Sequence, residues 1–175
     1  MDVDAAYSKL KNPEVADDVN QELIRAFNVF GTVGNIERIE VDNDYVKDER
    51  FASFNHETHT ILLRSDRGRA GTAVAVKTSN RQFSTESGLH PYRHEIGHAL
   101  WDYLKRSDGD FLDKMLKVYT DNFIKTKRGV TLLSEYAKEN ASEMFAEAIA
   151  EILNGTPGEL SKRILADIQG RTYDE

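Results

Sequence analysis

The sequence predicts an α+β fold, in which an N-terminal helix and a small mixed sheet precede a helical C-terminal half. Strand signals are confined to the first half of the chain, whereas helical periodicity dominates after Pro91. No linker or internal repeat separates the two halves. A chain of 175 residues can bury roughly 70% of the surface that its unfolded state exposes, so we expect a single domain with one core over residues 1–175.

The first half begins with an amphipathic helix, which we expect over residues 13–30. Its apolar residues recur at spacings of three and four, and Pro13 suits a first helical turn. Gly31 and Gly34 then interrupt the pattern. Strands rich in β-branched and aromatic residues are expected next, at 36–41, 50–54 and 58–64, and the last two form a hairpin.

The segment from 65 to 89 is rich in Gly, Ser, Thr and Arg. We expect a partly irregular insertion there, with one further strand candidate at 72–76. Helical periodicity then continues to the end of the chain. The expected helices cover residues 92–105, 110–125, 141–153 and 158–168.

Composition excludes several kinds of site and partner. The chain has no cysteine, so disulfides and thiolate metal sites are excluded, and a histidine/carboxylate site is the strong option for a metal. The net charge of −7 argues against a nucleic-acid partner, since such binding depends largely on Lys and Arg side chains at phosphates.

The N-terminal sequence and the hydropathy bear on the expected cellular location. The N-terminus is acidic and polar, and no segment approaches the roughly 20 apolar residues of a membrane span. We therefore expect no membrane partner and, by default, a cytoplasmic location. A phage or prophage origin and non-classical export stay open, and the sequence indicates no oligomeric state.

The residues that can carry chemistry begin with an H-E-x-x-H motif at 94–98. Because it lies in a predicted helix, His94 and His98 project from one face, about 6 Å apart along the axis, and both can bind one cation. Glu95 is rotated by about 100° from His94, which places it beside the metal but off the ligand direction, as a general base requires. The alternative is that both histidines are ordinary half-buried side chains.

A catalytic zinc also needs a third protein ligand and an open position for water. Glu143 and Glu147 lie one turn apart on the predicted helix 141–153. Two carboxylates on one face suit one metal ligand and one partner for the outer nitrogen of a histidine. The spacing leaves a second interpretation open, in which Glu143 only caps the helix opposite Asn140 and Glu147 is a solvated surface charge.

Two longer segments carry a family resemblance. The motif continues as HEIGHALWDY over 94–103, and Tyr136 stands seven residues before Glu143, which is followed by FAEA at 145–148. In these segments the chain resembles zinc peptidases of the gluzincin type, namely the catalytic domain of anthrax lethal factor, the Pro-Pro endopeptidases and phage head-associated relatives. Met144 departs from that pattern, since the relatives usually have an aromatic residue there.

The resemblance implies a zincin-like fold and a zinc-dependent endopeptidase that hydrolyses peptide bonds of a peptide or protein substrate with a metal-activated water. It implies one Zn²⁺ per chain, with His94, His98 and Glu143 as ligands. Glu95 would be the general base, Tyr136 would steady the oxyanion, and Glu147 would be the acidic partner of His94. The alternative, from another functional class, is a phage or prophage structural module that retains the zinc fold as an inactive scaffold.

Substrate binding is expected at a strand. Residues 51–55 resemble the edge strand that pairs with extended substrates in thermolysin-like folds, which points to Ala52, Ser53 and Phe54; the segment 72–76 is the rival.

Three histidines are left out of the predicted site. His56 and His59 are expected to be surface or packing residues on the hairpin. His90 is omitted because we do not expect the helix to extend back through Pro91.

Overall fold

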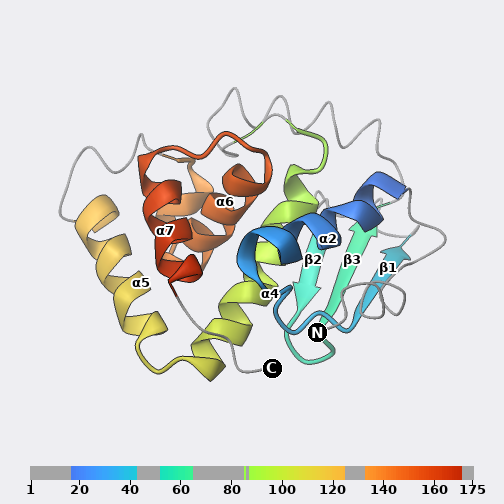
Figure 1. The fold of residues 1–175 in the computed structure, drawn as a ribbon, viewed down its shortest axis with the longest axis horizontal. Coiled ribbons are helices and arrows are strands. Elements are labelled where there is room, and N and C mark those ends of the chain that lie inside the picture. Colours follow the sequence, from blue (N-terminus) through green and yellow to red (C-terminus); the bar gives the residue numbers. More distant parts are fainter. Residues whose placement is uncertain (1–16, 43–51, 65–84, 86, 125–132, 171–175) are drawn as a thin grey trace.

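The computed structural model describes residues 17–42, 52–64, 85, 87–124 and 133–170 (Figure 1). The elements, in chain order, are α2 (Asp17–Phe30), β1 (Arg38–Asp42), β2 (Ala52–Asn55), β3 (Thr60–Arg64), α4 (His90–Ser107), α5 (Phe111–Tyr119), the π-helical turn η2 (Thr120–Ile124), the 3₁₀ turn η4 (Tyr136–Lys138), α6 (Ala141–Leu153) and α7 (Glu159–Gln169). The α+β class expected from the sequence is confirmed.

The described strands form one mixed sheet in the order β1-β3-β2. β2 and β3 are the expected antiparallel hairpin, with Ala52 opposite Leu63. β1 runs parallel to β3, with Arg38 opposite Thr60. The rival strand at 72–76 lies outside the described residues, as does the start of the expected N-terminal helix.

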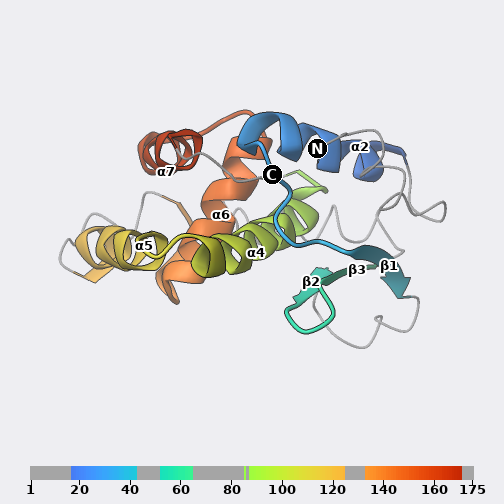
Figure 2. The same ribbon diagram turned by 60° about the horizontal axis from the view of Figure 1, so that its bottom comes forward.

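Helix α4 lies between the sheet and the C-terminal helices (Figures 1 and 2). β2 and β3 contact α4 on one side, α5 and α6 also pack against it, and α2 contacts both α4 and α7. A helix with neighbours on several sides cannot be amphipathic in the simple sense, and α4 is buried over most of its length. The H-E-x-x-H motif is therefore carried by a helix that lies largely inside the fold.

Helices α4 and α6 approach so closely that their backbones touch. A Cβ atom built on Gly97 would stand 2.6 Å from the Cα of Ala146, closer than real Cβ contacts occur. Only glycine fits at that point, and the small side chain of Ala146 helps the approach. The two helices that carry the candidate site residues are thereby held at a fixed short distance.

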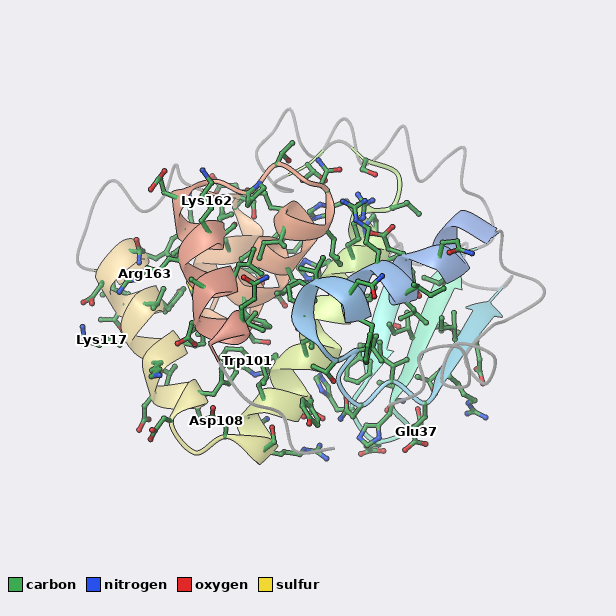
Figure 3. All side chains as sticks on the ribbon, in the orientation of Figure 1. Glu37, Trp101, Asp108, Lys117, Lys162 and Arg163 are labelled. Atoms are coloured by element: carbon green, nitrogen blue, oxygen red, sulfur yellow. The ribbon has the colours of Figure 1, made fainter. Side chains whose placement is uncertain are left out.

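Aromatic rings and large apolar side chains fill the space beside this contact. Trp101, labelled in Figure 3, lies 5.2 Å from Phe111 and 5.7 Å from Phe145 between ring centroids. Phe111 and Phe145 lie 5.3 Å apart in an edge-to-face arrangement, which is a favoured geometry for aromatic pairs. Met144 is fully buried in the same core.

A second close approach joins the segment after α2 to α4. Gly34 has a positive φ of 73°, and a Cβ there would stand 2.7 Å from the carbonyl oxygen of Ala99. The glycine that ends the helical pattern in the sequence therefore allows the chain to pass against α4 on its way to β1. None of the described helices is long and apolar enough to cross a membrane.

The Gly97 contact generates the first prediction. Gly97→Ala should push α4 and α6 apart and lower the free energy of unfolding by about 1–3 kcal/mol, the usual cost of overpacking. Urea denaturation followed by circular dichroism measures this loss. Gly109→Ala is the matched control, because a Cβ at Gly109 meets no atom within 4 Å. Equal stability of the two variants would show that the helices do not touch there.

Candidate metal centre

The first residue of α4 is His90, so the expectation that the helix would not extend back through Pro91 was wrong. Pro91 occupies the second helical position, where its missing N–H would have had no partner within the helix. The backbone N–H of His90 instead donates to the carbonyl of Ser87, at 2.9 Å. His90 therefore stands one helical turn before His94, with its side chain fully buried.

The inner nitrogens of the motif histidines converge on one carboxylate. His94 Nε2 lies 2.9 Å from one oxygen of Glu143, and His98 Nε2 lies 3.4 Å from the other. The two Nε2 atoms are 3.1 Å apart. Tetrahedral zinc at bond lengths of about 2.0–2.1 Å separates its ligand atoms by about 3.3 Å, so these spacings fit one zinc ion.

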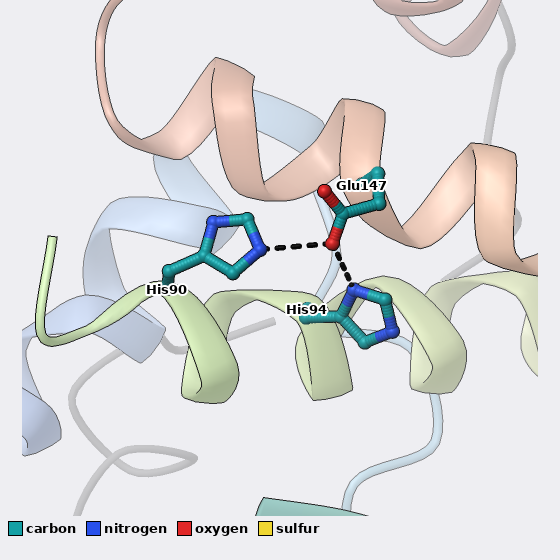
Figure 4. A group of neighbouring side chains, drawn as sticks. All are labelled: His90, His94 and Glu147. Atoms are coloured by element: carbon teal, nitrogen blue, oxygen red, sulfur yellow. Dashed lines mark hydrogen bonds and ion pairs between the residues drawn. The ribbon is translucent and has the colours of Figure 1, made fainter. Parts of the chain in front are cut away.

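The outer nitrogens of both histidines also have partners. His94 Nδ1 lies 2.7 Å from Glu147 Oε1, and Figure 4 shows that this leaves the other ring nitrogen pointing away from Glu147. His98 Nδ1 lies 3.1 Å from Ser142 Oγ. Metal-binding histidines commonly use the outer nitrogen in this way, because the bond fixes both the tautomer and the ring orientation. The arrangement therefore suits rings that present Nε2 to a metal.

Helix α6 supplies both carboxylates, and its N-terminus resolves one open question. Asn140 is the N-cap, and its side chain accepts a hydrogen bond from the backbone N–H of Glu143, at 2.9 Å. That cap uses the backbone of Glu143, so its carboxylate remains available to His94 and His98. Glu147 is fully buried, so the interpretation of this residue as a solvated surface charge is wrong.

Electrostatics follow from these contacts. Burial by itself would lower the pKa of His94, but its hydrogen bonds with Glu143 and Glu147 raise that pKa well above its usual value. Burial would raise the pKa of Glu143, but its hydrogen bonds with His94 and His98 lower it to about 2. Glu147 is fully buried as well, and the neighbouring His90 and His94 nevertheless lower its pKa. Two carboxylates thus flank the ring of His94 and favour its protonated form. A metal cation bound at Nε2 would replace the proton on that nitrogen.

Two overlapping groups of described residues could hold a metal ion: His94 with His98 and Glu143, and His94 with His90 and Glu147. In the second group both imidazoles contact the same oxygen of Glu147, at 2.8 and 2.7 Å. These are distances of charge-assisted hydrogen bonds, and the side chains of His90 and Glu147 are 0% exposed. The first group is partly open, with Glu143 at 22% exposure, and it fits a metal that must also bind water and substrate.

Glu95 and Tyr136 both lie near this first group. Glu95 is half-buried on α4, and its charge contributes to the raised pKa of His94. Tyr136 opens the 3₁₀ turn η4 just before the N-cap of α6, and its ring centroid lies 6.3 Å from that of His94. The turn and the helix cap thus place the phenol beside the histidines.

The predicted substrate strand lies at the border of the described sheet. β2 pairs only with β3 among the described strands, and it contacts α4. Ala52 and Phe54 are buried, whereas Ser53 between them is half-buried. The sequence prediction therefore selects a strand next to the helix that carries the histidines.

His56 and His59 belong to neither metal group. They lie on the β2–β3 turn, where His56 Nδ1 is 3.8 Å and His59 Nε2 is 4.0 Å from the buried carboxylate of Asp102.

His90 is the residue that the sequence prediction missed. Its spacing of four residues from His94 was the available signal, but Pro91 argued against a shared helix face.

Comparisons with protein-family models, with curated proteins and with solved structures gave no match to this chain. The proposal for its function therefore rests on the geometry of the site and on the motif resemblance.

The charge arrangement predicts a pH dependence for the metal-free protein. Glu143 has a lowered pKa, so its contribution to stability is present above its unfolded value of about 4.3 and is lost as the pH falls towards 2. His94 has a raised pKa, so its contribution is present below about 6.5 and is lost as the pH rises. The difference in unfolding free energy between wild type and Glu143→Gln should therefore be largest between about pH 4.3 and 6.5.

Urea titrations in the presence of a chelator measure this difference at each pH. Glu139→Gln is the control, because it removes the same charge from an exposed position outside the group. If the difference in unfolding free energy between wild type and Glu143→Gln varied with pH no more than that for Glu139→Gln, the ion-pair arrangement would be contradicted.

Proposed function

We propose that this protein is a zinc-dependent endopeptidase of the gluzincin type, with a zincin-like catalytic domain. The observation that carries the proposal is the convergence of His94 Nε2, His98 Nε2 and the Glu143 carboxylate at spacings of 2.9 to 3.4 Å. Three protein ligands of this type leave a fourth position for water or substrate, as catalytic zinc sites do. The motif resemblance to lethal factor and Pro-Pro endopeptidases supports the same ligand set.

A zinc ion held by these three residues would polarise the scissile carbonyl and make water acidic enough to attack it near neutral pH. Glu147 holds the ring of His94 through Nδ1, and Ser142 does the same for His98. Both Nε2 lone pairs are then directed to one point without reorganisation, which favours tight metal binding.

Glu95 is proposed as the general base. It follows His94 directly on α4, so it lies beside the ligands without pointing along their direction. Its carboxylate would take the proton of the attacking water and deliver it to the leaving amine. Because the Glu95 side chain is only half-buried, the attacking water and the leaving amine can both reach it.

Tyr136 is proposed as the donor to the developing oxyanion. Its ring lies edge-on to that of His94, so the phenol is close to the ligands but outside the helix that carries Glu143. A hydroxyl in this place would bond to charge that exists only in the transition state.

The substrate is proposed to be an extended peptide that adds as a strand along β2, at Ala52, Ser53 and Phe54. Main-chain hydrogen bonds would hold such a peptide, and pockets for alternate side chains would select it. The contact of β2 with α4 supports this, because α4 is the helix that carries the histidines.

Metal content is the first test of this function. The purified protein should bind one zinc per chain, and Glu143→Ala should lose most of it at micromolar free zinc, because one of three ligands is gone. Elemental analysis after dialysis measures the ratio. Glu139→Ala, exposed and outside the group, should keep its zinc. Full zinc content in Glu143→Ala would exclude the proposed ligand set.

Hydrolysis of a peptide library by the zinc-loaded protein is the second test. Glu95→Gln should keep zinc and fold but abolish cleavage, because an amide cannot accept the proton of water. Tyr136→Phe should lower kcat by about 10²-fold or more without changing zinc affinity, because it removes one transition-state hydrogen bond.

Tyr103→Phe is the matched control for the tyrosine, since it deletes the same oxygen about 13 Å along α4 from His94. Near-wild-type activity in Glu95→Gln would exclude its role as base. A zinc-loaded wild type that cleaves no peptide would favour the alternative of a structural module with an inactive zinc fold.

A further inference from the structure

A buried hydrogen-bonded chain includes the proposed ligand His94, and the proposed function uses only two of its members, His94 and Glu147. Oε1 of Glu147 contacts two histidines of α4 at once, His90 through Nε2 at 2.8 Å and His94 through Nδ1 at 2.7 Å (Figure 4). On its other side, His90 Nδ1 lies 2.9 Å from Thr85 Oγ1. The chain runs from Thr85 through His90 and Glu147 to His94.

The chemistry of a carboxylate fixes the direction of these bonds. Oε1 of Glu147 lies within hydrogen-bond distance of two imidazole nitrogens, and a carboxylate oxygen without a proton can only accept. Both contacting nitrogens must therefore carry protons, namely Nε2 of His90 and Nδ1 of His94. In a neutral His90 ring, Nδ1 then has the lone pair and accepts from the hydroxyl of Thr85.

The buried Glu147 carboxylate depends on its hydrogen bonds. A charge without exposure to solvent is costly unless such bonds are made. His90 and His94 approach Oε1 from successive turns of α4, as Figure 4 shows. Two donors on one oxygen hold that oxygen at a fixed place between the two helices.

We propose that His90 is a positioning residue of the metal site: it holds Glu147 so that Glu147 in turn directs Nε2 of His94 at the metal. The inference rests on the proposed function, because it assumes that His94 binds the metal through Nε2. It assigns to His90 the role of holding Glu147, which is itself the partner of the ligand His94. In this role Nε2 of His90 donates to Glu147 and takes no part in the group formed by His94, His98 and Glu143.

The tautomer of His90 is the direct readout, and it requires no substitution. Long-range proton–nitrogen correlation spectra of the ¹⁵N-labelled protein show which ring nitrogen carries the proton. His90 should carry it on Nε2, both with and without zinc. A proton on Nδ1 alone, or a zinc-induced shift of His90 Nε2 typical of a ligand, would overturn the proposal.

Zinc affinity is the second readout, measured by competition with a chromophoric chelator. His90→Phe keeps a ring but loses the donor, and its zinc affinity should fall by up to about 10- to 100-fold, the loss seen when the direct partner of a metal-bound histidine is removed. His90→Gln places an amide N–H near the position of Nε2, and it should recover most of that loss. His56→Gln is the matched control and should bind zinc as the wild type does, because His56 belongs to neither metal group.

Wild-type affinity in His90→Phe, or no recovery in His90→Gln, would contradict the positioning role. If His90→Phe fails to fold, the tautomer measured in the unmodified protein decides. If the wild type binds no zinc at all, the proposed function fails, whereas the spectrum of the metal-free protein still tests the hydrogen-bonded chain. The two failures are therefore distinguishable.

Discussion

The backbone contact between α4 and α6 is the constraint on which the rest of the site depends. His94 and His98 belong to one helix and Glu143 and Glu147 to the other, so the distance between the helix axes decides whether carboxylates can reach imidazoles. At Gly97 that distance is as short as backbone atoms allow. A glutamate side chain is short, and it reaches a histidine across two helices only when they are in close contact. The middle of the H-E-x-x-H motif therefore has a packing role, distinct from the chemical roles of the residues on either side.

Charge balance is the second consequence of this contact. Two carboxylates of α6 and three imidazoles of α4 are brought together in a largely buried space, where each charge must be compensated by a neighbour. In the metal-free protein the ring of His94 provides that compensation, with Glu143 at one nitrogen and Glu147 at the other. The same arrangement prepares the site for a divalent cation, because the acidic surroundings that favour a proton on His94 also favour a metal ion. Glu147 and His90 would keep their places on such an exchange, since Glu147 contacts the opposite nitrogen of the ring and His90 contacts Glu147.

The sheet is attached to α4 through a buried carboxylate. Asp102 is 2% exposed, and it accepts from Nδ2 of Asn35 at 2.7 Å, in the segment that leads to β1. Arg106 contacts the same oxygen at 3.0 Å from the next turn of α4. His56 and His59 approach Asp102 from the β2–β3 turn. Asp102 therefore connects α4 both to the segment before β1 and to the turn between β2 and β3. The turn next to the strand proposed to bind substrate thus contacts α4 at Asp102, about one helical turn beyond the histidine motif.

The α+β class, the mixed sheet, the helices after Pro91 and the histidine pair can be predicted from the sequence, because these features depend on periodicity and on residues within one or two turns of each other. The sequence also indicated Glu143 and Glu147 as a pair on one face, but it could not decide between buried partners and surface residues. The tertiary structure decided that point, since the contact between Glu147 and His94 joins residues 53 positions apart in the chain. It also decided the role of His90. A proline following a residue disfavours helical geometry in most contexts, and only the actual start of α4, with Pro91 in its first turn, places His90 on the same face as His94 and against a carboxylate that α6 supplies.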